Sequence, residues 1–333
     1  MQESERPTGG HRKAASRFYL GFVAAGALGA LALFYAVLGG LEATGNLPPP
    51  AFSNSLCLDE KLNHLREHPV TSPDLLVVGS SAAWRHFDGA SVASRAGAWQ
   101  PLNGGFCGLH INQSVHMAQW LLDRHPSVRQ VVLIAAPQDF TLCHARRTEV
   151  VDVGAADRFV HGGASRWPYY LRYFDPVSLF GNARRIKERR TSPASLDALV
   201  FSRWGDGPLD TPASRPTLYY GAPDPLDPAC FKALERLADR LEAEGRALTV
   251  VSSPLHPDWL AMQDPQRRFL DQFDARLLAV LSEHGGRYWN AAREWTPDRS
   301  AFTDAIHLRW SAAQQFSAAL ARKLIPAEGG ERG

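Results

Sequence analysis

The clearest indication of the fold is the run Asp74-Leu75-Leu76-Val77-Val78-Gly79-Ser80-Ser81. Its apolar residues follow one another without polar alternation, which is typical of a strand buried on both faces in a parallel sheet. A glycine ends the run, and two serines follow it. In open parallel sheets, ligands bind at the carboxyl ends of the strands. The stretch therefore predicts a buried strand that ends in a functional turn.

The same order of elements recurs along the chain. Apolar runs predict further strands, and apolar residues at helical spacing predict the helices between them. The predicted strands lie at 131–135, 248–251 and around 288–289, and the predicted helices at 110–122, 231–241, 264–284 and 310–324. Such alternation predicts an α/β fold in which helices cover both faces of a mainly parallel sheet.

Residues 144–225 break this alternation. They are rich in proline, and we expect them to form an insertion beside the site and not a separate domain. The basic stretch at 184–190 predicts a solvated helix face, or alternatively a contact with an anionic polymer or with lipid headgroups.

An uncharged, mostly apolar run covers residues 18–41. At 1.5 Å per residue it exceeds the roughly 30 Å hydrocarbon core of a bilayer, so it predicts a single transmembrane helix. Four basic residues precede the run, and the next one follows only at Lys61. This asymmetry predicts an N-terminus in the cytoplasm and a domain outside the inner or plasma membrane, which means the periplasm. A cleaved signal peptide is the alternative, but its apolar region is normally shorter.

Composition excludes several classes of protein. The 333 residues are 45% hydrophobic with a net charge of +2, whereas nucleic-acid-binding proteins are normally strongly basic. Neither a dinucleotide-binding motif nor a P-loop is present, so no nucleotide cofactor is expected. The four cysteines form no CxxC pair and predict no metal site. One or two disulfides are expected in an oxidising compartment, and the pairing among Cys57, Cys107, Cys143 and Cys230 stays open.

Three residues form a candidate catalytic triad. Asp304 and His307 occur as D-x-x-H just before the last predicted helix, so the carboxylate can orient the imidazole. Ser81 lies at the start of the helix after the first strand, where its N–H could also stabilise an oxyanion. Simpler alternatives remain open: Ser81 or Asp304 as a helix cap, or Ser80 as the nucleophile.

In this order, the motifs resemble the blocks of the SGNH (GDSL-type) hydrolases, especially the extracytoplasmic members that move acetyl groups on and off polysaccharides. The resemblance covers about residues 74–325 and rests on four short matches: Gly79-Ser80-Ser81; Asn103, Gly105 and Gly108; Ala136-Pro137-Gln138-Asp139; and Asp304, His307 and Leu308. It implies a flavodoxin-like, three-layer α/β/α sandwich with five parallel strands. The chain departs from the family in the third block, where Gln138 replaces an asparagine.

The resemblance implies a role for each matched residue. Ser81 would be the nucleophile, His307 the base and Asp304 its orienting acid. The oxyanion donors would be Ser81, Gly108 and, by analogy, Gln138. We expect Asn103 and His256 to contact the substrate, an acylated carbohydrate or another ester. No cofactor is expected.

The resemblance also implies that such transferases often receive acyl groups from a multi-pass membrane partner. The alternative is a catalytically inactive protein that binds glycan or scaffolds an assembly for envelope polysaccharide. The expected division of the chain is a cytoplasmic tail at 1–17, an anchor at 18–41, a linker leading into the domain at 42–70, the catalytic domain at 71–326 and a tail at 327–333.

Overall fold

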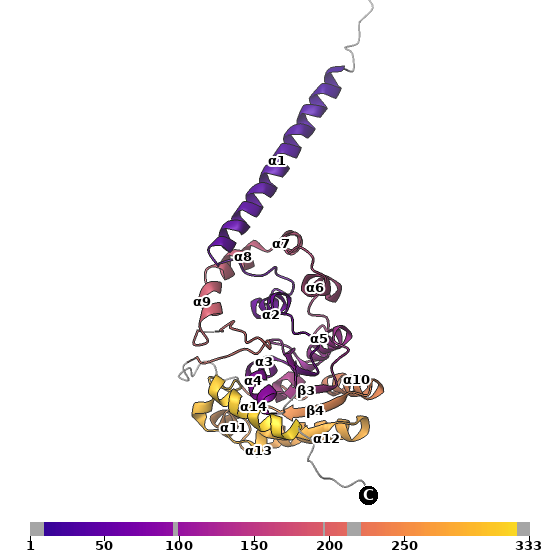
Figure 1. Ribbon diagram of the computed structural model, residues 1–333, viewed down its shortest axis with the longest axis vertical. Helices are drawn as coiled ribbons and strands as arrows, with labels where there is room; N and C mark the ends of the chain where they lie inside the picture. Colours follow the sequence, from indigo (N-terminus) through magenta and orange to yellow (C-terminus); the bar gives the residue numbers. More distant parts are fainter. Residues whose placement is uncertain (1–9, 96–98, 196, 212–220, 325–333) are drawn as a thin grey trace, which may run out of the picture.

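The computed structural model describes residues 10–95, 99–195, 197–211 and 221–324 (Figure 1). The expected C-terminal tail and residues 1–9 of the expected cytoplasmic tail lie outside these ranges. Five parallel strands form one sheet in the order β2-β1-β3-β4-β5. They are β1 (Leu75–Gly79), β2 (Pro101–Asn103), β3 (Gln130–Ala135), β4 (Ala247–Ser252) and β5 (Arg287–Trp289). This is the flavodoxin-like strand order, so the predicted α/β fold is confirmed.

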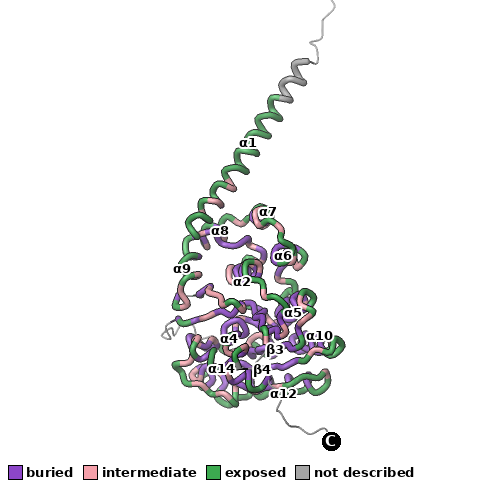
Figure 2. Tube along the Cα trace, in the orientation of Figure 1, coloured by how far each residue is buried: buried purple, intermediate pink, exposed green. Residues whose placement is uncertain are grey.

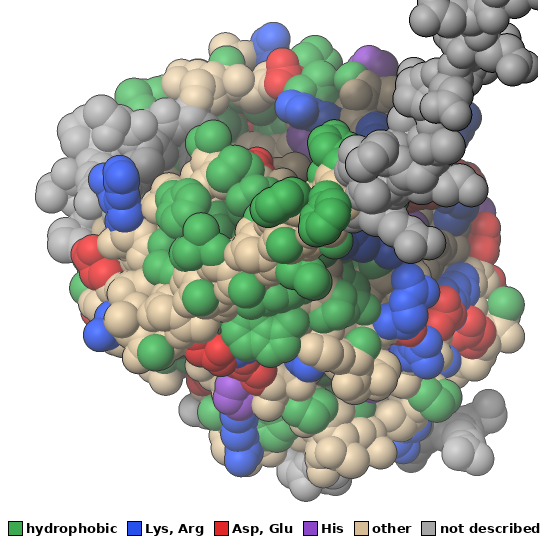
Figure 3. All heavy atoms as spheres, turned by 90° about the horizontal axis from the view of Figure 1, so that it is seen from above, with side chains coloured by type: hydrophobic (Ala, Val, Ile, Leu, Met, Phe, Trp, Pro, Cys, Tyr) green, Lys and Arg blue, Asp and Glu red, His purple; other side chains and the backbone are tan. Residues whose placement is uncertain are grey.

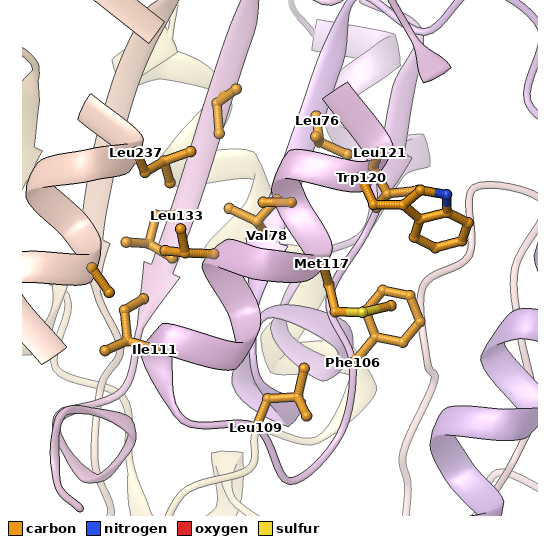
Figure 4. Packing of buried hydrophobic residues seen from close by; sticks show 14 of the residues in the cluster. Leu76, Val78, Phe106, Leu109, Ile111, Met117, Trp120, Leu121, Leu133 and Leu237 are labelled. Carbon is orange, nitrogen blue, oxygen red and sulfur yellow. The ribbon is translucent and has the colours of Figure 1, made fainter. Parts of the chain in front are cut away.

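Alternate residues of each strand enter separate cores on the two faces of the sheet. Leu76 and Leu133 belong to the core under α5 (Ile111–Arg124) and α10 (Pro228–Ala243), as Figure 4 shows. Val77 and Val132 face the opposite core. There they lie under α3 (Ser81–His86), α4 (Gly89–Arg95) and α14 (Trp310–Leu324). Burial on both faces explains why these strands are uniformly apolar.

Further helical elements complete the domain around the sheet. The 3₁₀ helix η1 (Pro137–Phe140) follows β3, and α11 (Pro257–Gln263) follows β4. The long helix α12 (Arg268–His284) leads to β5, after which α13 (Ala291–Glu294) and η3 (Arg299–Ala301) precede the last helix.

The helices of the insertion lie with α2 (Leu56–Glu67) between the sheet and the helix α1 (Gly10–Ala43) (Figure 1). They are α6 (Val153–Val160), α7 (Trp167–Arg172), α8 (Pro176–Ala183) and α9 (Ile186–Thr191). The segment Phe18–Ala43 of α1 contains an 18-residue stretch with a mean hydropathy of 2.1, and it is long and apolar enough to cross a membrane. Most of this segment is exposed and projects from the domain (Figure 2).

Three local features differ from the sequence-based expectations. The strand β2 was not predicted. The helix α12 begins at Arg268 and not at 264, because the Asp264 carboxylate accepts the N–H groups of Phe269 and Leu270 in its first turn. The proline-rich stretch expected to be a linker packs against the domain, since the Phe52 ring contacts aromatic rings of the insertion and is only 8% exposed.

All four cysteines form disulfides. Cys57 pairs with Cys107, and Cys143 pairs with Cys230. The first bond ties the start of α2 to the glycine-rich loop after β2. The second ties the segment after η1 to α10.

Candidate active site

Ser81 lies just after the carboxyl end of β1, an interior strand of the sheet, because the chain makes a sharp turn there. Gly79 has φ +140°, and a Cβ on it would lie 2.5 Å from the carbonyl oxygen of Ile134. Only glycine fits this position. The hydroxyl of Ser80 accepts the N–H of Ala82 and caps α3. Ser80 is therefore the cap, and Ser81 is the first residue of the helix.

Ser81, His307 and Asp304 form a continuous hydrogen-bonded relay. The Nε2 atom of His307 lies 2.8 Å from Ser81 Oγ, and its Nδ1 lies 2.7 Å from Asp304 Oδ2. A carboxylate can only accept, so Nδ1 carries the proton and Nε2 is free to accept from the serine hydroxyl. This is the tautomer that a general base for a serine nucleophile requires.

The Asp304 carboxylate is fixed by its own turn. Its Oδ1 accepts the N–H groups of Ile306 and His307 at 2.8 Å each. Burial alone would raise the pKa of Asp304, but the charge of His307 and these hydrogen bonds outweigh burial and lower the pKa to about 2. The carboxylate stays ionised at neutral pH and can stabilise a protonated His307.

His86 supports the loop that carries His307. Its Nε2 accepts the N–H of Leu308 at 3.1 Å, so its Nδ1 carries the proton that is donated to Ser253 Oγ, also at 3.1 Å. Burial, followed by the charge of His307, lowers the pKa of His86 to about 3. His86 is therefore neutral and ties together the end of α3, the residue after β4 and the loop that carries His307. The sequence analysis did not identify it.

A cavity of about 400 Å³ opens over the relay. Its wall combines the loop before α14, the start of α3, the glycine-rich loop and the insertion. The residues that line it are Leu56, Cys57, Ser81, Trp84, Arg85, Cys107, Gly108, Arg189, Asp197, Leu199, Leu209, Thr211, Thr303, Asp304 and His307.

Two backbone N–H groups are candidates for an oxyanion hole. As the first residue of α3, Ser81 has an N–H without an intrahelical acceptor. Gly108 lines the cavity with φ +68°, a conformation that favours glycine. The neighbouring Cys107 is held by its disulfide, which fixes the loop on which Gly108 lies.

Asn103 does not reach the cavity, which corrects its expected contact with substrate. It is fully buried, and its amide donates to the carbonyls of Ala83 and Trp84 and to the Asp206 carboxylate. Its Oδ1 accepts the N–H of Gly105 at 2.9 Å. Asn103 thus holds the glycine-rich loop in place from the buried side, away from the cavity.

Gln138 and His256 also lie outside the cavity lining. Both polar atoms of the Gln138 side chain are buried without a hydrogen-bond partner. His256 caps α11 by accepting the N–H of Asp258, and its ring packs on Phe302. The backbone N–H of His256 donates to the carbonyl of Ala305, so His256 supports the loop that carries His307.

Arg85 is a cavity residue that the sequence analysis missed. Its guanidinium donates to the carbonyls of Ala198 and Gly207, at 2.6 and 3.2 Å. It stacks on the Trp84 ring, 3.6 Å from the centroid. Arg85 therefore holds the 197–211 segment of the insertion over the cavity. No local pattern reveals this, since its partners lie more than a hundred residues away.

No cluster of three or more His, Cys, Asp or Glu side chains that could hold a metal ion occurs among the residues described.

Comparison with known proteins adds little beyond the architecture. No protein-family model matches the sequence, and no curated protein matches it. Among solved structures, one described as a putative arylesterase from Agrobacterium tumefaciens str. C58 has a TM-score of 0.42 and 12% identity, and covers 75% of this chain and 97% of its own. The native M. smegmatis aryl esterase has a TM-score of 0.37 and 13% identity, with the same coverage. Likeness this distant decides nothing about activity.

Proposed function

We propose that the chain is a membrane-anchored serine esterase or O-acyltransferase that acts on O-acetyl groups of a cell-envelope or exported polysaccharide. The observation that carries the proposal is the relay of Ser81, His307 and Asp304, with its hydrogen bonds of 2.8 and 2.7 Å at the floor of a cavity. A relay complete in all three members also favours catalysis over the alternative of an inactive glycan-binding protein.

The reaction follows from the geometry in two halves. Ser81 Oγ attacks the ester carbonyl while its proton passes to His307 Nε2. The N–H groups of Ser81 and Gly108 donate to the resulting oxyanion. When the intermediate collapses, the C–O bond to the alcohol breaks, and the alcohol leaves with the proton from His307. Gln138 is given no part in this step.

The second half releases the acyl group. An incoming hydroxyl gives its proton to His307 as its oxygen attacks the acyl carbon. The bond between that carbon and Ser81 Oγ then breaks, and Oγ takes the proton back from His307, which regenerates Ser81. If the hydroxyl belongs to water, the protein is an esterase, and if it belongs to a sugar, the protein is a transferase. For a transferase, a multi-pass membrane protein that delivers acyl groups is the proposed partner.

Three features support an extracytoplasmic polysaccharide as the substrate. Both disulfides suit an oxidising compartment. The apolar helix α1, with its preceding basic residues, suits an anchor whose domain lies outside the cytoplasm. The cavity wall includes charged and hydroxyl side chains that can hydrogen-bond to sugar hydroxyls, among them Arg189, Asp197 and Thr211.

Turnover of para-nitrophenyl acetate by the full chain in detergent micelles tests the proposal. Ser81→Ala and His307→Ala should each lower kcat/KM by at least about a thousandfold. The matched control is His284→Ala, because His284 forms a similar histidine–aspartate pair with Asp239 on the surface. Unchanged turnover in either relay variant, or none by folded wild type even with acetylated glycan, would favour the binding role.

A further inference from the structure

The helices α7 and α8 form an amphipathic pair beside the end of α1. Tyr170 and Leu179 point inward and are 5 and 8% exposed. Leu171, Phe174, Val177 and Phe180 are exposed by 53, 47, 82 and 48%. We call these four side chains the apolar foot. Four large apolar side chains exposed within ten residues of sequence indicate a binding face.

Contacts with α1 place the foot at a definite height along that helix. The Phe174 ring lies edge-on to Phe34, with centroids 5.1 Å apart. Trp167 lies edge-on to Tyr35, and Leu38 is fully buried beside Tyr170 and Leu179. The turn of α1 at residues 34–38 and the α7–α8 pair are therefore packed together.

This height coincides with the border of a bilayer. About 20 apolar residues cross the hydrocarbon core. Counted from Phe18, where the apolar segment begins, that length ends near Val37, within a turn of Phe34 and Tyr35. Aromatic side chains such as Tyr35 and Trp167 are typical of this interfacial level. A bilayer crossed by α1 would consequently meet the exposed side of the foot.

Charge at the margin of the foot fits the same occupant. Arg184, Arg185 and Lys187 follow α8 directly and are exposed. Seen from the side of α1, hydrophobic side chains gather near the centre of the surface, with both basic and acidic side chains around them (Figure 3). Basic residues at an interface attract anionic lipid headgroups.

We propose that the apolar foot lies in the interfacial region of the outer leaflet. The domain would then contact the membrane directly and would not be attached to it through α1 alone. The inference rests on the proposed function only in taking α1 as the anchor. The wall of the Ser81 cavity includes Arg189, on the helix α9 that follows the foot and its basic margin. The foot therefore fixes the orientation of the cavity relative to the bilayer.

The test places a fluorescent label on the foot of the full chain. All four native cysteines are in disulfides, so a maleimide dye would react only with the introduced thiol of Val177→Cys. The matched control is Leu278→Cys, because Leu278 is 51% exposed on α12, at the far end of the domain from α1 (Figure 1). Phe180→Cys is a second foot variant in case Val177→Cys misfolds.

Each labelled chain is reconstituted into vesicles of phosphatidylcholine and phosphatidylglycerol that carry a spin label near the headgroup end of the acyl chain. The foot label should be quenched at least about twofold more strongly than the control, since interfacial helices bury their apolar face about 5–10 Å into the headgroup boundary. Equal quenching at both positions would overturn the proposal, and a foot covered by a partner protein would give this result. A chain that fails to float with the vesicles would overturn the anchor as well, whereas loss of ester turnover alone would not bear on the foot.

Discussion

At the scale of single residues, the chemistry depends on which nitrogen of His307 carries its proton. Asp304 accepts from Nδ1 and so leaves Nε2 free to face Ser81. The carboxylate is itself held by two backbone N–H groups. The tautomer is thus set within the turn formed by residues 304–307.

Asp304→Asn should keep the fold but lose the tautomer. An amide nitrogen in place of Oδ2 would donate to Nδ1, which moves the proton to Nε2 and removes the base. We expect kcat to fall on the order of 10³- to 10⁴-fold, with the unfolding temperature little changed. The control is Asp210→Asn, a largely exposed carboxylate paired with Arg309. A loss in kcat no larger than that of the control would contradict the role of Asp304.

His86 makes folding stability depend on pH. Its pKa is about 3 in the folded chain and about 6.5 in the unfolded one, because burial disfavours the charged form. Below pH 6.5 the unfolded chain binds a proton that the folded chain does not, so the free energy of unfolding falls as the pH drops from 6.5 to 3. Above pH 6.5 this dependence disappears.

His86→Gln should therefore flatten the pH dependence between 6.5 and 3 while lowering stability at pH 7. Urea unfolding at several pH values measures both effects. Part of the slope will remain, because burial also lowers the pKa of His64 to about 3. A slope identical to that of wild type would show that His86 is not buried as a neutral group.

At the scale of elements, the glycine-rich loop is held by a covalent bond next to the proposed oxyanion donor. Cys57 and Cys107 close a loop of 50 residues. Removing such a bond with Cys57→Ser and Cys107→Ser should lower the free energy of unfolding by about 3–4 kcal/mol, measured by urea unfolding. Because Gly108 adjoins Cys107, kcat should fall as well.

The second disulfide is the matched control for this effect. Cys143→Ser with Cys230→Ser opens a longer loop, of 87 residues, but neither cysteine lines the cavity. The control should lose stability with kcat largely retained at a temperature where both variants are folded. Equal losses of kcat in the two variants would show that the first bond acts through global stability alone.

The elements that the sequence predicted are those with a strong local pattern. The strands β1, β3 and β4 are apolar runs because both of their faces are buried. The strand β2 escaped prediction since its three residues are too few to show a period. The helices of the insertion escaped it because they are short and depend on contacts far along the chain, such as that of Phe52 with Phe159.

The site shows the same division. Three site residues could be predicted from sequence because they belong to short motifs next to strand and helix ends: Ser81, Asp304 and His307. Arg85 and His86 could not be predicted in this way, because their partners are distant in sequence. Arg85 contacts the insertion, and His86 contacts the residue after β4 and the loop that carries His307. Asn103 was identified as a motif residue, but only its hydrogen bonds show that it works from behind the loop.

At the scale of the whole molecule, we propose that α1 crosses the membrane and that the domain lies outside it. A fusion of alkaline phosphatase after residue 45 should be active in a bacterial host, because this enzyme folds only where disulfides form. A fusion of a cytoplasmic reporter at the same position should be inactive. Replacing Arg6, Arg12, Lys13 and Arg17 by glutamine should weaken this orientation. An active cytoplasmic reporter on the native sequence would contradict the topology.

The central claim is that Ser81 is a nucleophile activated by His307. The most direct test treats the folded chain with diethyl para-nitrophenyl phosphate and locates the adduct by peptide mass spectrometry. We expect one phosphorylated serine, Ser81. Labelling should slow sharply in His307→Ala but not in His284→Ala. An adduct on Ser80, or no adduct on a folded chain, would contradict it.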